Sequence, residues 1–310
     1  YDGISNLGYS IFTAKIYPEY KMVYKNFIFI AGLKTFASFD TENESTNIFL
    51  LPNLKIQRPV IKDLLNVYGG FFSDLKTNTY KDFTSQNSFV SPTLFITQTV
   101  EKQNLFLGIN GKITNDLVYN FKYSNIKEED KPLFLRNNSR SDGSSSIVNG
   151  NQLKGYEYGN SFGIYYDDVT TTSIFGEIEY SLTKNILLGT YATYNTYQIT
   201  NALEEWNLPT LEASFSAKYK NNKWFASTNI FYVSERKDAI YNGQNPSSFN
   251  SIETIEGFMD VNLNGGYHFN DKFSAFLNVN NLLNTKYQRF ANFDTQGIQV
   301  LGGITYKFDF

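Results

Sequence analysis

GIQVLGGITYKFDF (residues 297–310) ends the chain and decides the fold, because its side chains change character at every second position. One face of the implied strand carries apolar or small side chains: Val300, Gly302, Ile304, Tyr306, Phe308 and Phe310. The other face is largely polar: Leu301, Gly303, Thr305, Lys307 and Asp309. Successive side chains of a strand point to opposite sides. An apolar side that finishes on exposed aromatics is typical of the last strand of an outer-membrane barrel, with that side toward lipid.

The amino-acid composition favours strands over helices. Of the 310 residues, 23 are Tyr and 28 are Phe, whereas only 18% are charged. Aromatic side chains suit a pleated sheet. No run of about 18 apolar residues predicts a transmembrane helix, and no signal peptide is recognisable at the start. Because only every second residue of a barrel strand faces lipid, the negative mean hydropathy fits a barrel as well as a soluble β-protein.

Several kinds of site are disfavoured by the residue counts. The absence of Cys removes disulfides and thiolate metal ligands, and a net charge of −3 without a basic patch argues against nucleic acid as a partner. His268 is the only His, and we interpret it as a polar residue of the barrel interior rather than a metal ligand. We find no nucleophile elbow, phosphate loop or catalytic triad. The sequence therefore predicts neither an enzyme nor a bound cofactor or metal.

Short turns and long polar loops alternate along the chain, and this alternation predicts the architecture. The short connections are residues 24–26, 62–65, 114–116, 183–185, 221–222 and 270–271. The long polar segments are residues 40–47, 77–102, 127–160, 201–209, 237–256 and 289–296. Short periplasmic turns with longer extracellular loops are the pattern of a bacterial outer-membrane barrel. A soluble sandwich has no reason to separate its loops by length in this way.

The predicted fold is all-β, an antiparallel up-and-down transmembrane β-barrel with about 13–14 strands. The first of these strands covers residues 8–23, and residues 161–182 form one strand with an interruption at Asp167 and Asp168. Counting back from a periplasmic C-terminus gives about thirteen strands, an odd number, whereas single-chain bacterial barrels have an even number. We therefore expect residues 1–310 to be the C-terminal part of a larger barrel. A complete barrel of about 14 strands is the alternative.

A resemblance to a known family rests on residues 257–308, which read GFMDVNLNGGYHFNDKFSAFLNVNNLLNTKYQRFANFDTQGIQVLGGITYKF. This stretch is similar to the C-terminal end of TonB-dependent outer-membrane receptors. Those receptors close a strand on an Asn-Leu-aromatic-Asn-x-x-Tyr box and end on a Gly-containing strand with a terminal aromatic. The box here is NLLNTKY (residues 281–287), in which Leu283 replaces the usual aromatic. Residues 66–94 are similar to a mid-barrel stretch of related receptors.

The resemblance implies a location and a function. Members of this family lie in the outer membrane of Gram-negative bacteria and have barrels of 22 strands. They import a scarce ligand, such as a siderophore, a cofactor, an oligosaccharide or a peptide. Their further partners are membrane lipid, the barrel assembly machinery, a surface lipoprotein in some systems, and the TonB system. Contact with TonB is made through a plug domain, for which residues 1–310 contain no match.

Candidate ligand-binding residues lie in the long loops. Trp206, Tyr241 and Phe249, with nearby Asn and Gln, could form a surface that contacts a sugar or peptide, although packing between neighbouring loops explains the same residues. The acidic groups at residues 42–44, 128–130 and 167–168 lack the spacing of a Ca²⁺ loop, so we interpret them as solvated charge. Glu204 and Glu205 are adjacent and point apart at a loop tip, so we do not interpret them as a pair of catalytic carboxylates. Tyr306, Phe308 and Phe310 resemble the signal that the barrel assembly machinery reads.

Two other functions stay open at the level of sequence. A complete barrel of about 14 strands would be a passive, porin-like channel. A secreted adhesin or structural β-protein would be soluble without detergent. The long polar loops predict where a ligand would bind but do not identify it.

Overall fold

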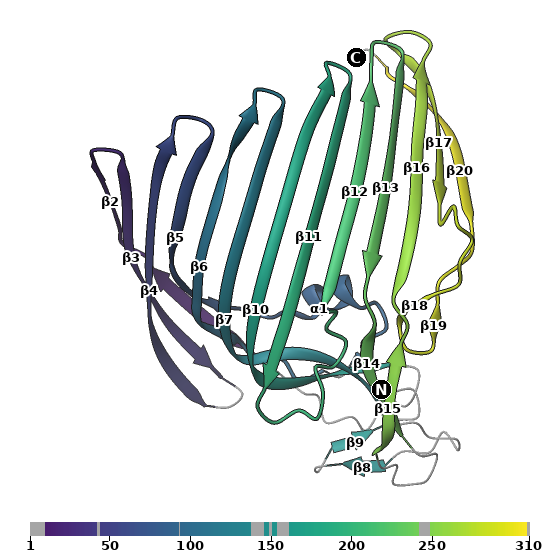
Figure 1. Cartoon of the computed structure of the whole chain (residues 1–310). Helices are drawn as coiled ribbons and strands as arrows, with labels where there is room; N and C mark the ends of the chain where they lie inside the picture. Colours follow the sequence, from purple (N-terminus) through teal and green to yellow (C-terminus); the bar gives the residue numbers. More distant parts are fainter. Residues whose placement is uncertain are drawn as a thin grey trace.

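The computed structural model describes residues 10–41, 44–92, 94–137, 146–148, 151–153, 161–241 and 249–308. A single large antiparallel sheet dominates the molecule (Figure 1). Its strands are β1 (Ile11–Ile16), β2 (Glu19–Tyr24), β3 (Phe27–Asp40), β4 (Ser45–Ile61), β5 (Leu65–Lys76), β6 (Thr99–Thr114), β7 (Leu117–Arg136), β10 (Phe162–Thr183), β11 (Ile186–Ile199), β12 (Leu211–Lys220), β13 (Trp224–Val233), β16 (Phe258–His268), β17 (Phe273–Asn280) and β20 (Gln299–Tyr306). The predicted all-β, up-and-down architecture is confirmed.

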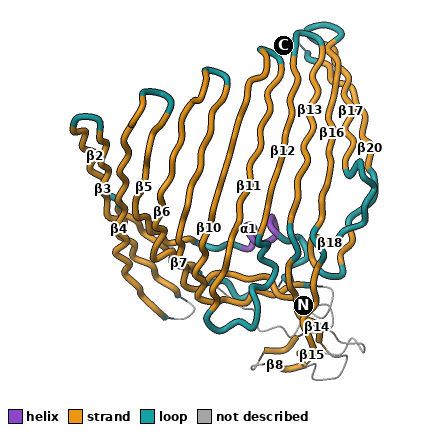
Figure 2. Tube along the Cα trace, in the orientation of Figure 1, coloured by secondary structure: helices purple, strands orange, loops and turns teal. Residues whose placement is uncertain are grey.

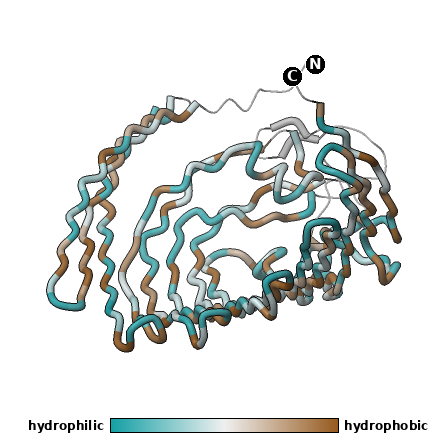
Figure 3. The backbone as a smooth tube through the Cα atoms, turned by 90° about the horizontal axis from the view of Figure 1, so that it is seen from above, coloured by the Kyte–Doolittle hydropathy of each residue, from teal (hydrophilic) through white to brown (hydrophobic). Residues whose placement is uncertain are grey.

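Each strand of the sheet pairs with the next one along the chain, and the sheet curves into an arc (Figure 3). β1 and β2 both pair with β3, and their register is continuous across Tyr17 and Pro18. They therefore occupy one position, and the sheet has the thirteen positions that the sequence predicted. The break falls at Pro18, which has no N–H to give to the ladder. In the described part of the chain, β20 pairs only with β17 and does not close onto β1 or β2.

The two ends of the sheet differ as the loop lengths predicted. Tight turns join β2 to β3, β4 to β5, β6 to β7, β10 to β11, β12 to β13 and β16 to β17 at one end. All the longer connections lie at the other end, where teal loops gather at the bottom of Figure 2. The β3–β4 connection also lies there, but at residues 41–44 it is as short as the β16–β17 turn and shorter than the polar loop predicted at residues 40–47. We call these the turn end and the loop end.

The two faces of the sheet differ in chemistry, and the strand register shows it. One row of register partners, from β7 to β16, is largely apolar: Tyr119, Ile178, Thr190, Phe215, Ile230 and Val261. The adjacent row faces the other way and is mostly polar or small: Val118, Glu179, Gly189, Ser216, Asn229 and Asn262. Exposed apolar side chains on the first face, such as Leu107 and Ile174, have no covering layer in the described residues. This is the alternation of a barrel wall with an apolar outer face and a polar inner face.

The loop end contains more regular structure than the sequence predicted. A helix, α1 (Tyr80–Gln86), lies in the connection between β5 and β6, which was expected to be a polar tip. Residues 237–256 were expected to be a loop but contribute to the hairpin of β14 (Arg236–Tyr241) and β15 (Phe249–Ile255). Small pairs also form between β8 (Ser146–Val148) and β9 (Asn151–Leu153), and between β18 (Gln288–Phe290) and β19 (Phe293–Asp294).

The strand β7 runs to Arg136, although residues 127–160 were expected to be irregular. Its last residues pair with the first residues of β10, and this extended hairpin (residues 131–136 with 162–167) is buried or half-buried along its whole length and packs apolar side chains on both faces. Phe134, Phe162, Ile164 and Tyr166 belong to or pack against one apolar cluster, which includes Phe83 of α1. Leu133, Leu135 and Tyr165 belong to or pack against another, which includes Trp206. A strand buried on both sides loses the polar alternation that identifies a strand in sequence.

The predicted interruption at Asp167 and Asp168 is confirmed, because the register of β10 on β7 shifts between Asp167 and Val169.

In the described part of the chain, no helix is long and apolar enough to cross a membrane.

Candidate functional site: a cavity at the loop end

A cavity of about 700 Å³ opens on the inner side of the sheet at the loop end. Its lining comes from six parts of the chain that are distant in sequence: Lys76, Asn78, Gln86, Thr99, Glu128, Lys131, Pro132, Phe134, Trp206, Asn207, Leu208, Pro209, Glu212, Phe231, Val233, Arg236, Phe258, Tyr287, Arg289 and Phe290. Glu212, Val233 and Phe258 are register partners on the inner face of β12, β13 and β16. The cavity therefore mixes aromatic rings with charged side chains, as ligand sites do.

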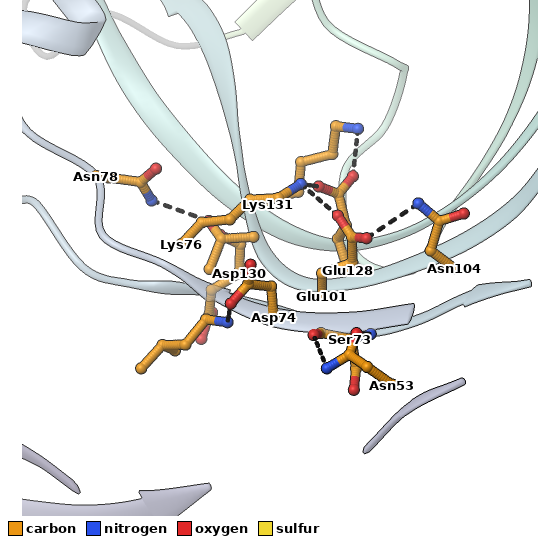
Figure 4. A network of polar contacts seen from close by, with 12 residues as sticks. Asn53, Ser73, Asp74, Lys76, Asn78, Glu101, Asn104, Glu128, Asp130 and Lys131 are labelled. Atoms are coloured by element: carbon orange, nitrogen blue, oxygen red, sulfur yellow. Dashed lines mark hydrogen bonds and ion pairs between the residues drawn. The ribbon is translucent and has the colours of Figure 1, made fainter. Parts of the chain in front are cut away.

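One wall of the cavity is a ladder of ion pairs (Figure 4). The Lys76 Nζ lies 2.6 Å from a carboxylate oxygen of Glu101 and 2.6 Å from one of Glu128. Lys131 adds a second cation, 2.5 Å from the other oxygen of Glu128. Burial alone would raise the pKa of Glu128, but Lys131 and Lys76 outweigh it and hold the pKa below its ordinary value. Two carboxylates and two ammonium groups thus neutralise one another on this wall.

Polar contacts continue along the inner face of β3, β4 and β5 below this ladder (Figure 4). The buried Lys34 lies 2.8 Å from Asp74 and donates to the carbonyl of Ser73. The side-chain amide of Asn53 donates to the backbone carbonyl of Ser73, and the backbone amide of Ser73 donates to the side-chain oxygen of Asn53. The inner wall is therefore polar and internally paired from the cavity toward the turn end.

Aromatic rings form a second wall of the cavity. The rings of Phe258 and Tyr287 stack with centroids 4.0 Å apart and an interplanar angle of 7°. The Tyr287 hydroxyl donates to a carboxylate oxygen of Asp260 at 2.7 Å. Burial raises the pKa of Tyr287, and the hydrogen bond to Asp260 raises it further, so this hydroxyl stays protonated. Phe231 meets the edge of Phe258 at 5.9 Å.

The Asn-Leu box explains how Tyr287 reaches the cavity. Asn281 and Asn284 both have a φ of 50°, in the left-handed region that Asn tolerates better than most residues. The Asn281 side chain donates to the carbonyls of Thr285 and Gln296, and it accepts from the Thr285 amide. These contacts fold the box into a fixed turn. The resemblance singled out this box for its sequence, and the structure gives it the role of positioning Tyr287.

A buried arginine lies beside the aromatic wall. Arg236 is only 5% exposed, and its guanidinium group donates to the carbonyls of Arg289 at 2.5 Å and Gln288 at 3.0 Å. Its centre lies 5.4 Å from the centroid of the Phe258 ring. Burial lowers the pKa of Arg236, and the neighbouring charge of Arg289 lowers it further. Sequence reasoning missed this residue, because a single Arg in a polar loop carries no pattern.

The three loop aromatics proposed from sequence are placed differently. Trp206 is 4% exposed, lines the cavity and packs with Leu133 and Ala239. Tyr241 packs against the same cluster without lining the cavity, and burial raises its pKa to about 12. Phe249 pairs with Tyr241 across the β14–β15 hairpin and is 45% exposed. The structure thus brings Trp206 and Tyr241 together and leaves Phe249 on the surface.

The remaining candidate residues lie away from the cavity. His268 is half-buried near the turn end, with its ring 5.3 Å from that of Phe225. The described residues contain no group of three or more metal-ligating side chains. Tyr306 ends β20 and meets Phe308 edge to face at 4.9 Å, and both are exposed. Phe310 lies outside the described residues.

Comparison with known proteins identifies the fold. No protein-family model matches the sequence, and no curated protein is detectably similar to it. Solved structures are similar in shape. The pyoverdine outer-membrane receptor FpvA from Pseudomonas aeruginosa PAO1 superposes with a TM-score of 0.66 at 15% identity, over 97% of this chain and 43% of that chain. The fold of this chain is that of a portion of the barrel of a TonB-dependent receptor.

Two further structures support this fold assignment. The FrpB iron transporter from Neisseria meningitidis gives a TM-score of 0.64 at 13% identity, over 97% of this chain and 46% of that chain. The copper transporter OprC gives 0.61 at 16% identity, over 96% and 48%. The chain therefore spans less than half the length of the receptors whose fold it shares.

Proposed function

We propose that residues 1–310 are the C-terminal part of the barrel of an energised outer-membrane receptor, which imports a scarce ligand in a Gram-negative bacterium. The observation that carries this proposal is the position of the cavity. It lies on the inner side of a wall whose outer face is apolar, at the end where the long loops gather. A ligand bound there would enter from the loop side and be surrounded by barrel wall.

The structural neighbours support a transport role. They include proteins named as receptors or transporters for pyoverdine, iron, copper and ferric enterobactin. The inner wall of this chain offers ion pairs, hydrogen-bond donors and aromatic rings that would hold a small molecule or a peptide without covalent chemistry. The proposed partners are membrane lipid on the apolar face, the barrel assembly machinery at Tyr306, Phe308 and Phe310, and the TonB system through a plug domain.

Uptake measurements test the proposal. Cells with and without the gene are supplied with radiolabelled ferric siderophores and, separately, radiolabelled copper, in the presence or absence of an uncoupler. We expect gene-dependent accumulation of one of these that stops when the proton-motive force or TonB is removed. Accumulation that persists without energy would identify a passive channel instead. Recovery of the protein in the soluble secreted fraction would contradict both transport functions.

A further inference from the structure

A second cavity, of about 550 Å³, lies on the outer face of the sheet, near the turn end. The residues that line it and belong to the outer face by register are Ile186, Ala217, Tyr219, Ala226, Thr228, Leu263, Gly265, Leu277 and Val279. Lys218, Ser227 and Asn264 lie between these residues in the chain and complete the lining. Small residues of β12, β13 and β16 thus lie between bulky residues of β11 and β17. We call this cavity the outer groove.

The packing of the sheet does not require the small size of Gly265. A Cβ atom at this position would lie 3.6 Å from its nearest neighbour, the Phe225 carbonyl oxygen, which is an ordinary contact. On the inner face, a Cβ atom at Gly266 would clash with the Phe225 ring, so that position does need a glycine. A glycine inside a strand weakens the strand, because it has no side chain to pack. The depression at Gly265 is therefore a property of the outer surface itself.

An aromatic pair borders the outer groove on the side of the turns. Trp224 and Tyr267 are register partners on the outer face, two residues closer to the turns than Ala226 and Gly265. Their ring centroids lie 4.6 Å apart, and Trp224 is 55% exposed. Trp and Tyr side chains gather at the level of the lipid headgroups in membrane proteins. If the outer face lies in a bilayer, the outer groove therefore begins at the edge of the hydrocarbon layer.

Exposed lysines follow on the other side of the aromatic pair. Lys223 directly precedes Trp224, and Lys184 lies in the tight turn that precedes Ile186. Further charged residues near these turns are Lys220, Lys272, Lys307, Asp116 and Asp271. Positive charge therefore predominates at the point where lipid headgroups would lie.

We infer that the outer groove binds one anionic phospholipid, such as phosphatidylglycerol, from the leaflet at the turn end. Along β13, the order of lysine, aromatic ring and groove matches the order of phosphate, glycerol backbone and acyl chain in that lipid. Lipid tails are as apolar as the wall, so burial of apolar surface gives no preference. The preference arises from the fit of the chain in the groove and from the attraction of the phosphate to Lys184 and Lys223. This inference uses the proposed membrane location and is independent of import.

Quenching of Trp224 fluorescence by brominated lipids tests the inference, with the protein in phosphatidylcholine bilayers that contain a small fraction of brominated lipid. The other tryptophan of the chain, Trp206, is buried at the loop end. We expect brominated phosphatidylglycerol to quench at severalfold lower mole fractions than brominated phosphatidylcholine with the same acyl chains. Ala226→Leu, which fills the groove, should remove most of this preference. Lys223→Gln should lower it about threefold, because it removes one cation near the phosphate.

Ala192→Leu and Lys62→Gln are the matched controls and should keep the full preference. Ala192 lies on the outer face of β11 away from the groove, Lys62 lies in the β4–β5 turn, and both are exposed. Equal quenching by the two lipids, or equal effects of Ala226→Leu and Ala192→Leu, would overturn the inference. Protection of Trp224 from both lipids, as a second copy of the chain on this face would cause, would also overturn it. Failure of energised uptake with an intact, groove-dependent lipid preference would overturn the proposed function alone.

Discussion

At the residue scale, one carboxylate holds the connection between β11 and β12 in place. Asp167 is buried and accepts hydrogen bonds from the backbone amides of Thr200, Asn201 and Ala202. Burial alone would raise its pKa, but the hydrogen bonds from Ala202 and Asn201 outweigh it and lower the pKa below the ordinary value. The connection leads directly to Trp206, which lines the cavity.

Replacing this carboxylate should loosen the connection. Asp167→Asn removes the charge and places an amide NH₂ group against backbone N–H donors. We expect this to lower the local stability of the connection by about 1–3 kcal/mol. We expect the amides of Thr200, Asn201 and Ala202 to lose about tenfold to a hundredfold protection from hydrogen exchange. Asp168→Asn is the control, since among the contacts described the Asp168 carboxylate accepts only from the Asp130 amide, and its backbone carbonyl, which accepts from the Thr200 hydroxyl, is unchanged by the substitution. Equal protection in both variants would show that Asp167 does not hold the connection.

The same contact predicts a pH dependence. A carboxylate whose pKa is lower in the folded protein stabilises the fold above its unfolded pKa, which is about 3.9 for Asp. That stabilisation is lost as the pH falls through the depressed pKa of the folded state. Protection of the three amides, corrected for intrinsic exchange, should therefore be constant from pH 7 to about pH 4 and decline below it.

At the scale of elements, the extended β7–β10 hairpin organises the loop end. Leu133, Leu135 and Tyr165 belong to or pack against the Trp206 cluster, whereas Phe134, Phe162 and Ile164 belong to or pack against the α1 cluster. Leu133 is fully buried. The hairpin therefore packs against the helix, the β11–β12 connection and the β14–β15 hairpin. Because close-packed side chains have little room to move, we expect this packing to hold the cavity walls in place.

Leu133→Ala should weaken this unit. A buried Leu→Ala substitution costs about 2–5 kcal/mol, because it removes apolar contacts and leaves a cavity. In a background with Trp224→Phe, Trp206 is the only tryptophan, so its emission reports on the loop end. We expect the emission of Leu133→Ala to shift to the red at a lower urea concentration. Leu203→Ala, at an exposed position of the β11–β12 connection, should change the midpoint little. Coincident midpoints would contradict this role for Leu133.

The elements also show where sequence reasoning works and where it stops. The strands between the tight turns were predictable, because period-two alternation and local turn residues specify them without reference to distant contacts. The end of β7 was not, since KPLFLR packs apolar side chains on both faces and therefore lacks the alternation of apolar and polar residues. The helix α1 has a recognisable start, with Thr79 accepting from the Asp82 amide, but seven residues are too few for a helical period.

The cavity was less predictable than the sheet. Trp206 was identified as a loop aromatic, but the residues that line the cavity with it lie up to 130 positions away in the chain. Arg236 and Arg289 become a pair only through the packing of β14 against the β17–β20 connection. No local spacing encodes such a contact. Tyr287 is the exception, because the box that positions it is a continuous stretch of sequence.

At the scale of the whole molecule, the register of the sheet separates an apolar face from a polar one along every strand from β7 to β16. If the apolar face lies in a bilayer, the polar face must border water, since the charged and amide groups on it would otherwise be unsatisfied. This separation is the physical basis for both the proposed membrane location and the inner cavity. The central claim is therefore that adjacent residues of one strand face different solvents.

Cysteine scanning along β10 tests that claim most directly, because the chain has no native Cys. Single cysteines replace Ile174, Ile178 and Tyr180 on the apolar face, and Glu177 and Glu179 on the polar face. Isolated outer membranes are then treated with a charged, membrane-impermeant maleimide. We predict labelling at residues 177 and 179, and protection at 174, 178 and 180 until detergent is added. Equal labelling at all five positions before detergent would contradict a sheet that lies in the membrane.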